Sequence, residues 1–274
     1  MIELNNISKT FVSGYFFHKR KDAVINASLT IQKGKILGLV GESGSGKSTL
    51  GRIALRLIDP SSGTIVFDGT DITSLSKSAL RTFRPRMQIV FQDPDTVLDP
   101  LMTIGDSISE PIKIWRESNR HKTEEKVLEL LEIVGLRADM ISRFPFELSG
   151  GEKQRVALAR ALALEPEFIV ADEVSSALDL SVQAQILNLL KDIQRKRKLT
   201  YLFISHDLQV IQSMADHVAV MKDGVILEDQ KTSDLFSSPE DPYTRQLITE
   251  SHKSETWFGK DLLTLNKPPF PLQK

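Results

Sequence analysis

The chain has 274 residues, a formal net charge of −1 at pH 7, 41% hydrophobic residues and no cysteine. This length allows one large domain or two small ones, and the near-zero charge gives no indication of a nucleic-acid-binding protein. The lack of cysteine excludes disulfides, thiolate metal sites and iron–sulfur clusters built on this chain.

Short apolar runs in the first third of the chain predict β-strands, because their length and alternation are those of buried or half-buried strands. These runs span residues 2–7, 24–31, 36–40, 64–67 and 87–91. A helix is expected over 49–55, and the turn residues at 59–63 end it. A basic cluster at 18–21 falls in a polar loop, where it could contact an acidic partner or nothing.

The middle of the chain changes character after Asp93. Pro94, Pro100 and Pro111 break a loop-rich stretch, and the apolar spacing over 123–134 is helical. We therefore expect a helical region here, inserted into the rest of the domain.

Helical and strand patterns alternate after Gly151, which is typical of an α/β domain with a mainly parallel sheet. The expected elements are a helix from about 151 to the stop at Pro166, strands at 168–171 and 201–204, helices at 182–193 and 208–214, and strands at 217–221 and 225–227. The Asp223-Gly224 pair between the last two strands predicts a hairpin turn. After about Asp234 we expect weaker order, with an extended Pro-rich stretch at 267–271.

A glycine-rich loop follows the apolar strand at 36–40 and precedes the first expected helix. Its residues are Gly41, Glu42, Ser43, Gly44, Ser45, Gly46, Lys47 and Ser48, with Thr49 next. They match the pattern G-x-x-x-x-G-K-S/T, in which backbone N–H groups surround phosphates, the lysine reaches the outer phosphates and the hydroxyl ligates Mg²⁺. A flexible Gly/Ser loop is the alternative, but the strand and the helix on either side favour a nucleotide site.

Two adjacent carboxylates, Asp172 and Glu173, follow the apolar strand at 168–171. Ligands of such folds bind at the carboxyl edge of the parallel sheet. We expect Asp172 to hold Mg²⁺ through water, and Glu173 to orient and deprotonate the attacking water. An isolated Asp-Glu pair at a strand end is often only a surface dipeptide, but here it accompanies a phosphate-binding loop.

A third motif lies upstream of this pair, in Leu148-Ser149-Gly150-Gly151-Glu152. Together with the Lys-Gln-Arg that follows, it resembles the signature motif of the ATP-binding-cassette (ABC) proteins. A serine and two glycines at a helix N-terminus can present backbone donors to a γ-phosphate. The motif also has the pattern of a capping box, because the glutamate stands three residues after the serine, and both interpretations can hold together.

The resemblance to ABC proteins covers about residues 1–250 and implies roles for further residues. It implies that Gln92 senses Mg²⁺ and water and links to a transmembrane partner, and that His206 contacts the γ-phosphate. It also implies that Phe11 stacks on adenine, although Tyr15 and Phe16 are close enough in sequence to compete. The loop that crosses between two cassettes would be Ser176-Ala177-Leu178-Asp179.

The implied fold is an α/β, ABC-type P-loop NTPase. It would combine a RecA-like core, an N-terminal antiparallel β subdomain and an inserted helical subdomain at about 93–160 that carries the signature. The ABC ATPase domain would cover 1–235, and 236–274 would form a C-terminal tail of the peptide-importer type. Two departures from the family pattern, Glu152 in place of glutamine and Val174 in place of proline, remove no reacting group, so we expect an active ATPase.

One phosphate loop and one signature imply a partner, because ABC proteins bind ATP between the loop of one cassette and the signature of another. The partner would be a second ATPase subunit, either different from this chain or identical to it. Stretches at 92–100, 109–112, 181–187 and 241–245 are similar to ATPases of the dipeptide, oligopeptide and nickel importers, although Asp241 replaces the usual histidine.

This resemblance implies a peripheral protein at the cytoplasmic face of the cell membrane that energises import of oligopeptides or dipeptides. Its further partners would be two transmembrane permeases and, indirectly, an extracytoplasmic solute-binding protein. Its cofactors would be ATP and Mg²⁺, and no nucleic-acid partner is expected. A nickel or metal-chelate importer is an alternative. An exporter cassette, or a soluble ABC ATPase of translation or repair, is less favoured because the fused domains and insertions of those proteins are not found in this sequence.

Overall fold

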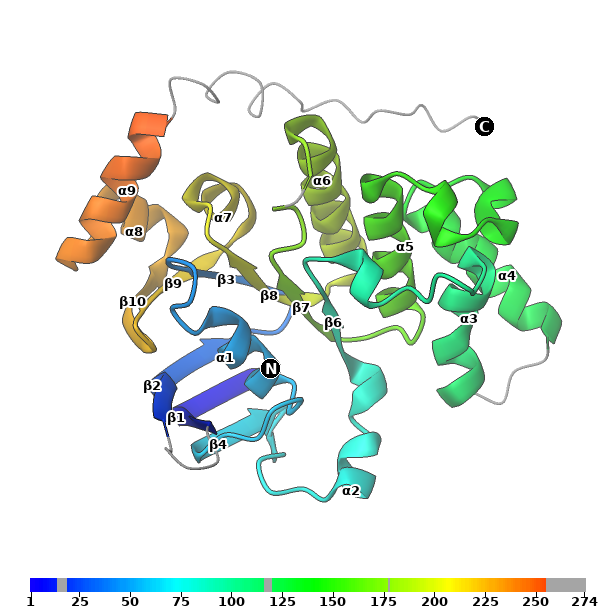
Figure 1. The fold of residues 1–274 in the computed structure, drawn as a ribbon. Coiled ribbons are helices and arrows are strands. Elements are labelled where there is room, and N and C mark those ends of the chain that lie inside the picture. Colours follow the sequence, from blue (N-terminus) through cyan, green and yellow to red (C-terminus); the bar gives the residue numbers. More distant parts are fainter. Residues whose placement is uncertain (14–18, 116–119, 177, 255–274) are drawn as a thin grey trace.

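Two β-sheets organise the computed structural model, which describes residues 1–13, 19–115, 120–176 and 178–254 (Figure 1). Within these ranges the first, antiparallel sheet has the order β2-β1-β4-β5 and contains β1 (Ile2–Ser13), β2 (Lys19–Ile31), β4 (Ser62–Phe67) and β5 (Thr70–Asp71). The second has the order β10-β9-β3-β8-β7-β6 and contains β3 (Ile36–Val40), β6 (Met87–Val90), β7 (Phe168–Asp172), β8 (Thr200–Ser205), β9 (His217–Lys222) and β10 (Val225–Lys231). Its pairs from β9 to β6 are parallel, which confirms the predicted α/β class.

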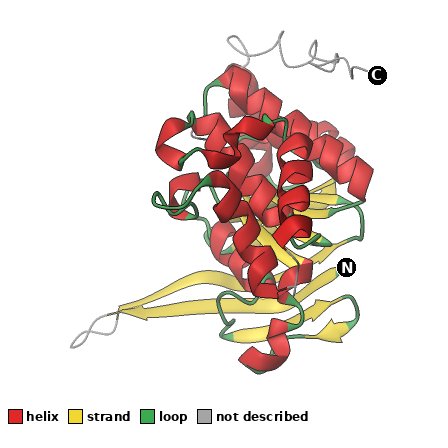
Figure 2. Ribbon diagram, turned by 90° about the vertical axis from the view of Figure 1, so that its right-hand side faces the viewer, coloured by secondary structure: helices red, strands yellow, loops and turns green. Residues whose placement is uncertain are grey.

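Helices cover the parallel sheet and extend beyond its β6 edge (Figure 1). The α-helices in the described ranges are α1 (Lys47–Ala54), α2 (Lys77–Arg81), α3 (Ile104–Trp115), α4 (Arg120–Ile133), α5 (Gly150–Leu162), α6 (Leu180–Arg197), α7 (Leu208–Met214), α8 (Thr232–Ser237) and α9 (Pro242–Ser254). Short 3₁₀ turns span Arg84–Arg86, Pro94–Thr96, Ala138–Ser142 and Pro145–Glu147. Figure 2 shows most helices gathered on one side of the strands, while the long hairpin of β1 and β2 projects past them.

The parallel sheet has an apolar layer on each face, which explains why its strands are continuous apolar runs. On β8, Tyr201 and Phe203 belong to the core beneath α5, α6 and α7, whereas Leu202 and Ile204 belong to the core shared with α1 and the antiparallel sheet. Successive side chains of a strand point to opposite faces, so one apolar run contributes to both layers. Helix α1 is thereby held between the two sheets.

Pro111 lies inside α3, so the expectation that it breaks a loop-rich stretch is wrong. Proline has no backbone N–H, and the carbonyl four residues earlier in a helix therefore loses its donor. That carbonyl belongs to Ser107, and the Arg160 side chain of α5 donates to it over 2.7 Å. A residue of a different helix thus replaces the missing hydrogen bond.

The expectation of weaker order after Asp234 is wrong as far as Ser254, because α8 and α9 continue the fold. Helix α9 has polar residues on most of its surface, but Thr244 and Ile248 are buried against the rest of the domain. The Pro-rich stretch at 267–271 lies outside the described residues. The domain limits 1–235, 93–160 and 236–274 stay predictions.

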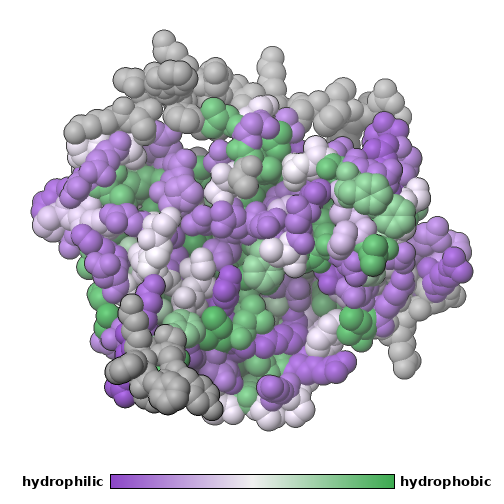
Figure 3. Space-filling view, in the orientation of Figure 1, coloured by the Kyte–Doolittle hydropathy of each residue, from purple (hydrophilic) through white to green (hydrophobic). Residues whose placement is uncertain are grey.

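The surface drawn in Figure 3 is mostly hydrophilic, with apolar residues in small separate patches. Among the described residues, the most exposed large apolar side chains are Leu101 and Phe146, at 85% and 73%. None of the helices in the described ranges combines the length and the apolar character that a bilayer-spanning helix needs.

Candidate functional site

The phosphate loop at 41–48 connects β3 to α1. Gly46 has a φ of +107°, and a Cβ at this position would overlap the Ala23 carbonyl oxygen, so only glycine fits. Gly46 is also the N-cap residue of α1, and no side chain caps this helix. The first N–H groups of α1 are therefore available to an anion, which the helix dipole also attracts.

The turn and the adjacent end of the β9–β10 hairpin contact the phosphate loop directly. Asp223 and Gly224, in its turn, have φ values of +47° and +85°, as expected for an Asp-Gly hairpin turn. The Gly224 N–H donates to the Ser45 carbonyl over 2.9 Å. The Met221 carbonyl lies so close to Gly41 that a Cβ would overlap it. The shape of the loop therefore depends on a segment far along the chain.

Lys47 is folded back onto its own loop. Its Nζ donates to the carbonyls of Gly41 (2.7 Å) and Glu42 (2.8 Å). Burial lowers the pKa of Lys47, while the carboxylates of Glu173, Asp172 and Glu42 act in the opposite direction. A phosphate would offer the buried ammonium a negatively charged partner in place of two neutral carbonyls, and charge-assisted hydrogen bonds are the stronger kind.

Ser48 and Asp172 meet beside the loop, although they are far apart in sequence. The Ser48 Oγ donates to the Asp172 Oδ1 over 2.8 Å. Burial raises the pKa of Asp172, whereas the Ser48 hydrogen bond and the Arg52 guanidinium lower it. The structure thus brings together two of the three predicted Mg²⁺ ligands, and both are oxygen donors of the kind that Mg²⁺ prefers. Gln92, the third, lies after β6 and lines the adjacent cavity.

Glu173 follows β7 directly and has a left-handed backbone, with a φ of +51°. This conformation is uncommon for residues other than glycine and tends to occur at functional sites. Its N–H donates to the Ile204 carbonyl over 3.0 Å, which ties it to the end of β8. Its Oε2 lies 3.4 Å from the His206 Nδ1. The two residues predicted to act at the γ-phosphate are therefore neighbours.

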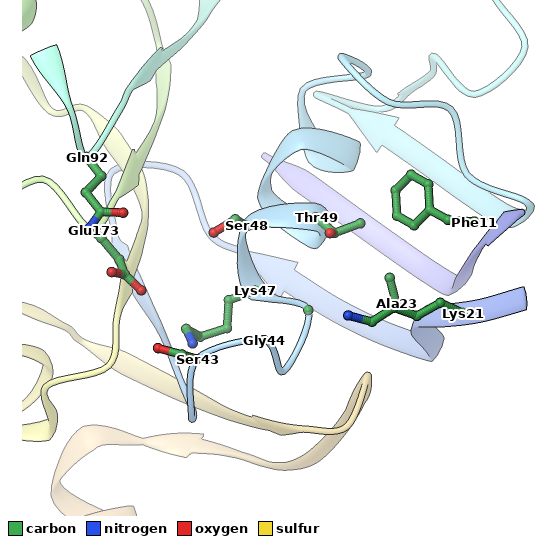
Figure 4. Close-up of a pocket in the computed structure, with 11 residues that line it drawn as sticks. Phe11, Lys21, Ala23, Ser43, Gly44, Lys47, Ser48, Thr49, Gln92 and Glu173 are labelled. Carbon is green, nitrogen blue, oxygen red and sulfur yellow. The ribbon is translucent and has the colours of Figure 1, made fainter. Parts of the chain in front are cut away.

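Many of the predicted nucleotide-binding residues line one cavity of about 410 Å³. Gln92 and Glu173 lie on one side of the loop and Phe11, which is 40% exposed, lies on the other (Figure 4). The lining residues are Phe11, Lys21, Ala23, Ser43, Gly44, Gly46, Lys47, Ser48, Thr49, Gln92 and Glu173. Of the residues predicted to bind the nucleotide or the metal ion or to act in hydrolysis, five do not line it, namely Gly41, Glu42, Ser45, Asp172 and His206. Tyr15 and Phe16 lie outside the described residues.

Sequence reasoning missed Lys21 and Ala23. Lys21 was part of a basic cluster with no assigned ligand, but on β2 it pairs with Phe11 of β1. Its side chain extends toward the phosphate loop (Figure 4). The signal that could have found it is the β1–β2 register, which the sequence alone did not specify.

The described part of the loop predicted to cross between two cassettes lies next to Glu173. A cavity of about 100 Å³ there is lined in part by Glu173, Ser176 and His206. The Ser176 Oγ donates to the Glu173 carbonyl over 3.0 Å. Asp179 caps α6 by accepting from the Val182 N–H over 3.0 Å, and Leu178 is half-buried. Ala177 lies outside the described residues.

The signature residues lie apart from the phosphate loop. Ser149 caps α5, and Glu152 accepts from the Ser149 N–H and Oγ, both over 2.8 Å. These hydrogen bonds lower the pKa of Glu152, so its carboxylate is favoured. Ser149 and Gly150 are exposed, Gly151 packs against Val182, and Leu148 is buried. None of the residues 148–152 lines the cavity at the phosphate loop, and α5 and α1 lie well separated in Figure 1.

A strand, a glycine loop and a helix with an uncapped N-terminus, beside a second strand that ends in Asp-Glu, define a P-loop nucleoside triphosphatase. The chain belongs to the ABC transporter family, whose sequence model matches residues 24–176. It is an ATP-binding cassette that hydrolyses ATP.

Named relatives and solved structures are similar over most of the chain. A putative peptide import ATP-binding protein of Brucella ovis is 50% identical over 82% of this chain and 71% of that protein. A dipeptide transport ATP-binding protein of Lactococcus lactis is 43% identical over 91% of this chain and 80% of that protein. The dimeric structure of an ATP-binding cassette in a post-hydrolysis state, bound to ADP and Pi, has a TM-score of 0.76 and 31% identity, covering 85% of this chain and 99% of that one.

Proposed function

We propose that this ATPase energises an importer of oligopeptides or dipeptides. The names of its relatives support the peptide cargo, and the stretches at 92–100 and 241–245 support an importer of the peptide and nickel subfamily. A nickel or metal-chelate importer is the rival assignment, because those importers share the same stretches. Cargo does not contact an ATPase subunit, so the choice between them depends on experiment.

The proposal that this ATPase works as one of a pair of cassettes rests on the separation of two incomplete half-sites in one chain. The cavity contains the phosphate loop, Gln92 and Glu173, while the exposed Ser149 presents the N-terminus of α5 elsewhere on the surface. A second cassette would bring its own signature to this loop and close over the γ-phosphate. We propose a heterodimer with a sister ATPase, with a homodimer as the alternative.

Within the site, the phosphates of ATP would lie on the N–H groups of the loop and of α1, with the Lys47 ammonium on the outer phosphates. The exposed ring of Phe11 would stack on adenine. The Lys9 ammonium lies 5.2 Å from the centroid of the Phe11 ring. Glu173 would take the proton of the attacking water, and His206 would contact the γ-phosphate.

Ser48, Asp172 and Gln92 would hold the metal ion. Their hydroxyl, carboxylate and amide oxygens fit Mg²⁺, which prefers a few protein oxygens together with water and substrate phosphates. The nucleotide phosphates and water would complete the site, as is usual for Mg²⁺ bound through one or two carboxylates. The bound ion would neutralise charge on the transferred phosphoryl group.

The pair of cassettes would act on two permease subunits from the cytoplasmic face of the membrane. Leu101 lies between Gln92 and α3, and Phe146 lies two residues before the signature. Both are exposed apolar side chains close in sequence to elements of the proposed site, and we propose that they contact the permeases. Movement at either contact would reach the nucleotide through a short segment of chain.

Reconstitution of the cassette with its permeases, sister ATPase and binding protein in lipid vesicles tests the function. We expect ATP hydrolysis to rise when the binding protein is loaded with di- or oligopeptides. A rise with a nickel chelate only would support the rival assignment. Hydrolysis that responds to neither cargo would contradict both importer assignments.

Lys21 gives a further prediction about the nucleotide site. Replacing it by alanine should weaken MgADP binding roughly twofold to fivefold, the usual scale for an exposed charge pair. The loss should shrink as salt is added, because mobile ions screen an exposed ammonium. Calorimetric titration at low and high ionic strength measures both effects.

Arg20 is the matched control for Lys21. It is the next residue of β2, is also exposed, and does not line the cavity. Its replacement by alanine should leave MgADP affinity unchanged. Equal affinities for the wild type and the Lys21 variant at low salt would remove Lys21 from the site.

A further inference from the structure

The Lys-Gln-Arg run after the signature lies outside both the signature and the cavity at the phosphate loop. Its middle residue, Gln154, is the fifth residue of α5, which begins at Gly150. Gln154 is only 2% exposed. A polar side chain buried to this degree normally has a hydrogen-bond partner, because an unpaired buried amide is costly. The partner of Gln154 therefore indicates what this residue does.

Gln154 contacts the segment that carries Gln92. Its Nε2 donates to the Phe91 carbonyl over 3.2 Å. Strand β6 ends at Val90, so Phe91 lies beyond the last pair of β6 with β7, which joins Val90 to Ala171. The hydrogen bond thus holds the backbone where the chain leaves the sheet, one residue before Gln92.

The backbone after Gln92 is held by the same helix. Lys153, also on α5, places its ammonium 2.8 Å from the Asp95 carboxylate. Asp95 belongs to the 3₁₀ turn at Pro94–Thr96, and the Asp93 side chain caps this turn by accepting from the Asp95 N–H over 3.0 Å. Helix α5 therefore contacts the chain on both sides of Gln92.

The position of the Gln92 side chain depends on this backbone. Gln92 is exposed, so surrounding side chains do not enclose it, and it lines the same cavity as Glu173. An amide oxygen that ligates Mg²⁺ has to be placed accurately, because Mg²⁺ demands near-ideal octahedral geometry. Groups that orient a metal ligand affect metal affinity although they do not touch the metal.

We infer that Gln154 and Lys153 are positioning residues for Gln92, which they hold within reach of the metal ion by fixing the backbone on either side of it. The inference rests on the proposed role of Gln92 as a Mg²⁺ ligand. Both residues belong to the helix that Ser149 caps. The helix that begins one half-site thus holds a metal ligand of the other.

Replacing Gln154 by methionine tests the inference, because methionine has a similar length but no N–H donor. We expect the affinity for a non-hydrolysable ATP analogue in the presence of Mg²⁺ to fall about threefold to tenfold, the usual scale of one hydrogen bond. In EDTA the affinity should be unchanged, because the phosphate loop and Lys47 are untouched. Calorimetric titration under both conditions measures the two affinities.

A double-mutant cycle with Gln92→Ala separates positioning from a general packing effect. If Gln154 acts through Gln92, adding Gln154→Met to Gln92→Ala should cause no further loss of affinity in Mg²⁺. A further loss as large as that of the single variant would overturn the inference. So would a loss of the same size with Mg²⁺ and in EDTA.

Gln194 provides the matched control. It lies on α6, outside the cavity, and its Nε2 donates to the carbonyls of Gly34 (2.7 Å) and Leu199 (3.3 Å). Replacing Gln194 by methionine makes the same chemical change and should leave both affinities unaltered.

Replacing Lys153 by methionine removes the second contact. The affinity in Mg²⁺ should fall roughly twofold, because the Asp95 carboxylate is exposed and such ion pairs are weak. If Gln154→Met does not fold, this variant decides, since an unchanged affinity in Mg²⁺ would refute the inference.

The Gln92→Ala variant by itself separates this inference from the proposed site. If it binds the analogue in Mg²⁺ as the wild type does, the proposed metal role of Gln92 is wrong and the inference falls with it. If it loses affinity while Gln154→Met and Lys153→Met keep that of the wild type, the site stands and only the positioning role is refuted.

Discussion

Replacing Glu173 by glutamine should leave ATP binding intact and slow hydrolysis by about 100- to 10 000-fold, the usual contribution of a general base. Glutamine has nearly the same shape but cannot accept the proton of the attacking water. The side chain should keep its place, because the backbone is tied to the Ile204 carbonyl over 3.0 Å. Phosphate release by the assembled ATPase pair, together with a titration of ATP, measures the two effects separately.

Glu132 is a suitable control for this variant, since it is an exposed carboxylate on α4, away from the cavity. Its replacement by glutamine should leave the rate of hydrolysis unchanged. Near-normal turnover by Glu173→Gln would show that another group activates water. A variant that lost ATP binding as well would indicate that Glu173 contributes to the structure of the site rather than to the chemical step.

Replacing Lys47 by alanine should weaken binding of MgATP by roughly 10- to 100-fold, which is the range for losing a hydrogen bond to a charged group. The buried ammonium now donates to the carbonyls of Gly41 and Glu42, so the variant also removes one donor from each, although the Glu42 carbonyl keeps the Ser45 N–H at 3.2 Å. Both effects act against an ordered phosphate loop. Calorimetric titration with a non-hydrolysable ATP analogue gives the change in affinity.

The exposed Lys77 on α2 serves as the control, because it carries the same charge without lining the cavity. Its replacement by alanine should leave ATP affinity as it is. If Lys47→Ala bound the analogue as tightly as the wild type, the loop would have to hold phosphate through its backbone alone.

Residues close together in sequence made the phosphate loop and the Asp172-Glu173 pair predictable. Spacing alone indicates that Gly46 and Lys47 lie between a strand and a helix, since each feature extends over only a few residues. The structure adds what distant segments contribute, such as the hydrogen bond from Ser48 to Asp172 and the proximity of His206 to Glu173. These contacts agree with the predicted roles, which the variants described above would test.

The features that sequence reasoning missed share one physical cause, because each depends on contacts between segments that are far apart in the chain. Lys21 enters the cavity because β1 and β2 pair in a particular register, and Pro111 is tolerated in α3 because Arg160 reaches across from α5. Helix α9 is ordered because it buries Ile248 and is held by Glu228.

The local sequence pattern specified the class of enzyme and the strands of its parallel sheet, and it predicted the residues of the phosphate loop. These depend on backbone conformation and on the period of apolar residues, which are set within a few positions. Folding determined the partners of each buried polar group and the separation of the signature from the phosphate loop. They depend on contacts between segments far apart in the chain, and the free energy of such contacts comes from packing that no local stretch encodes.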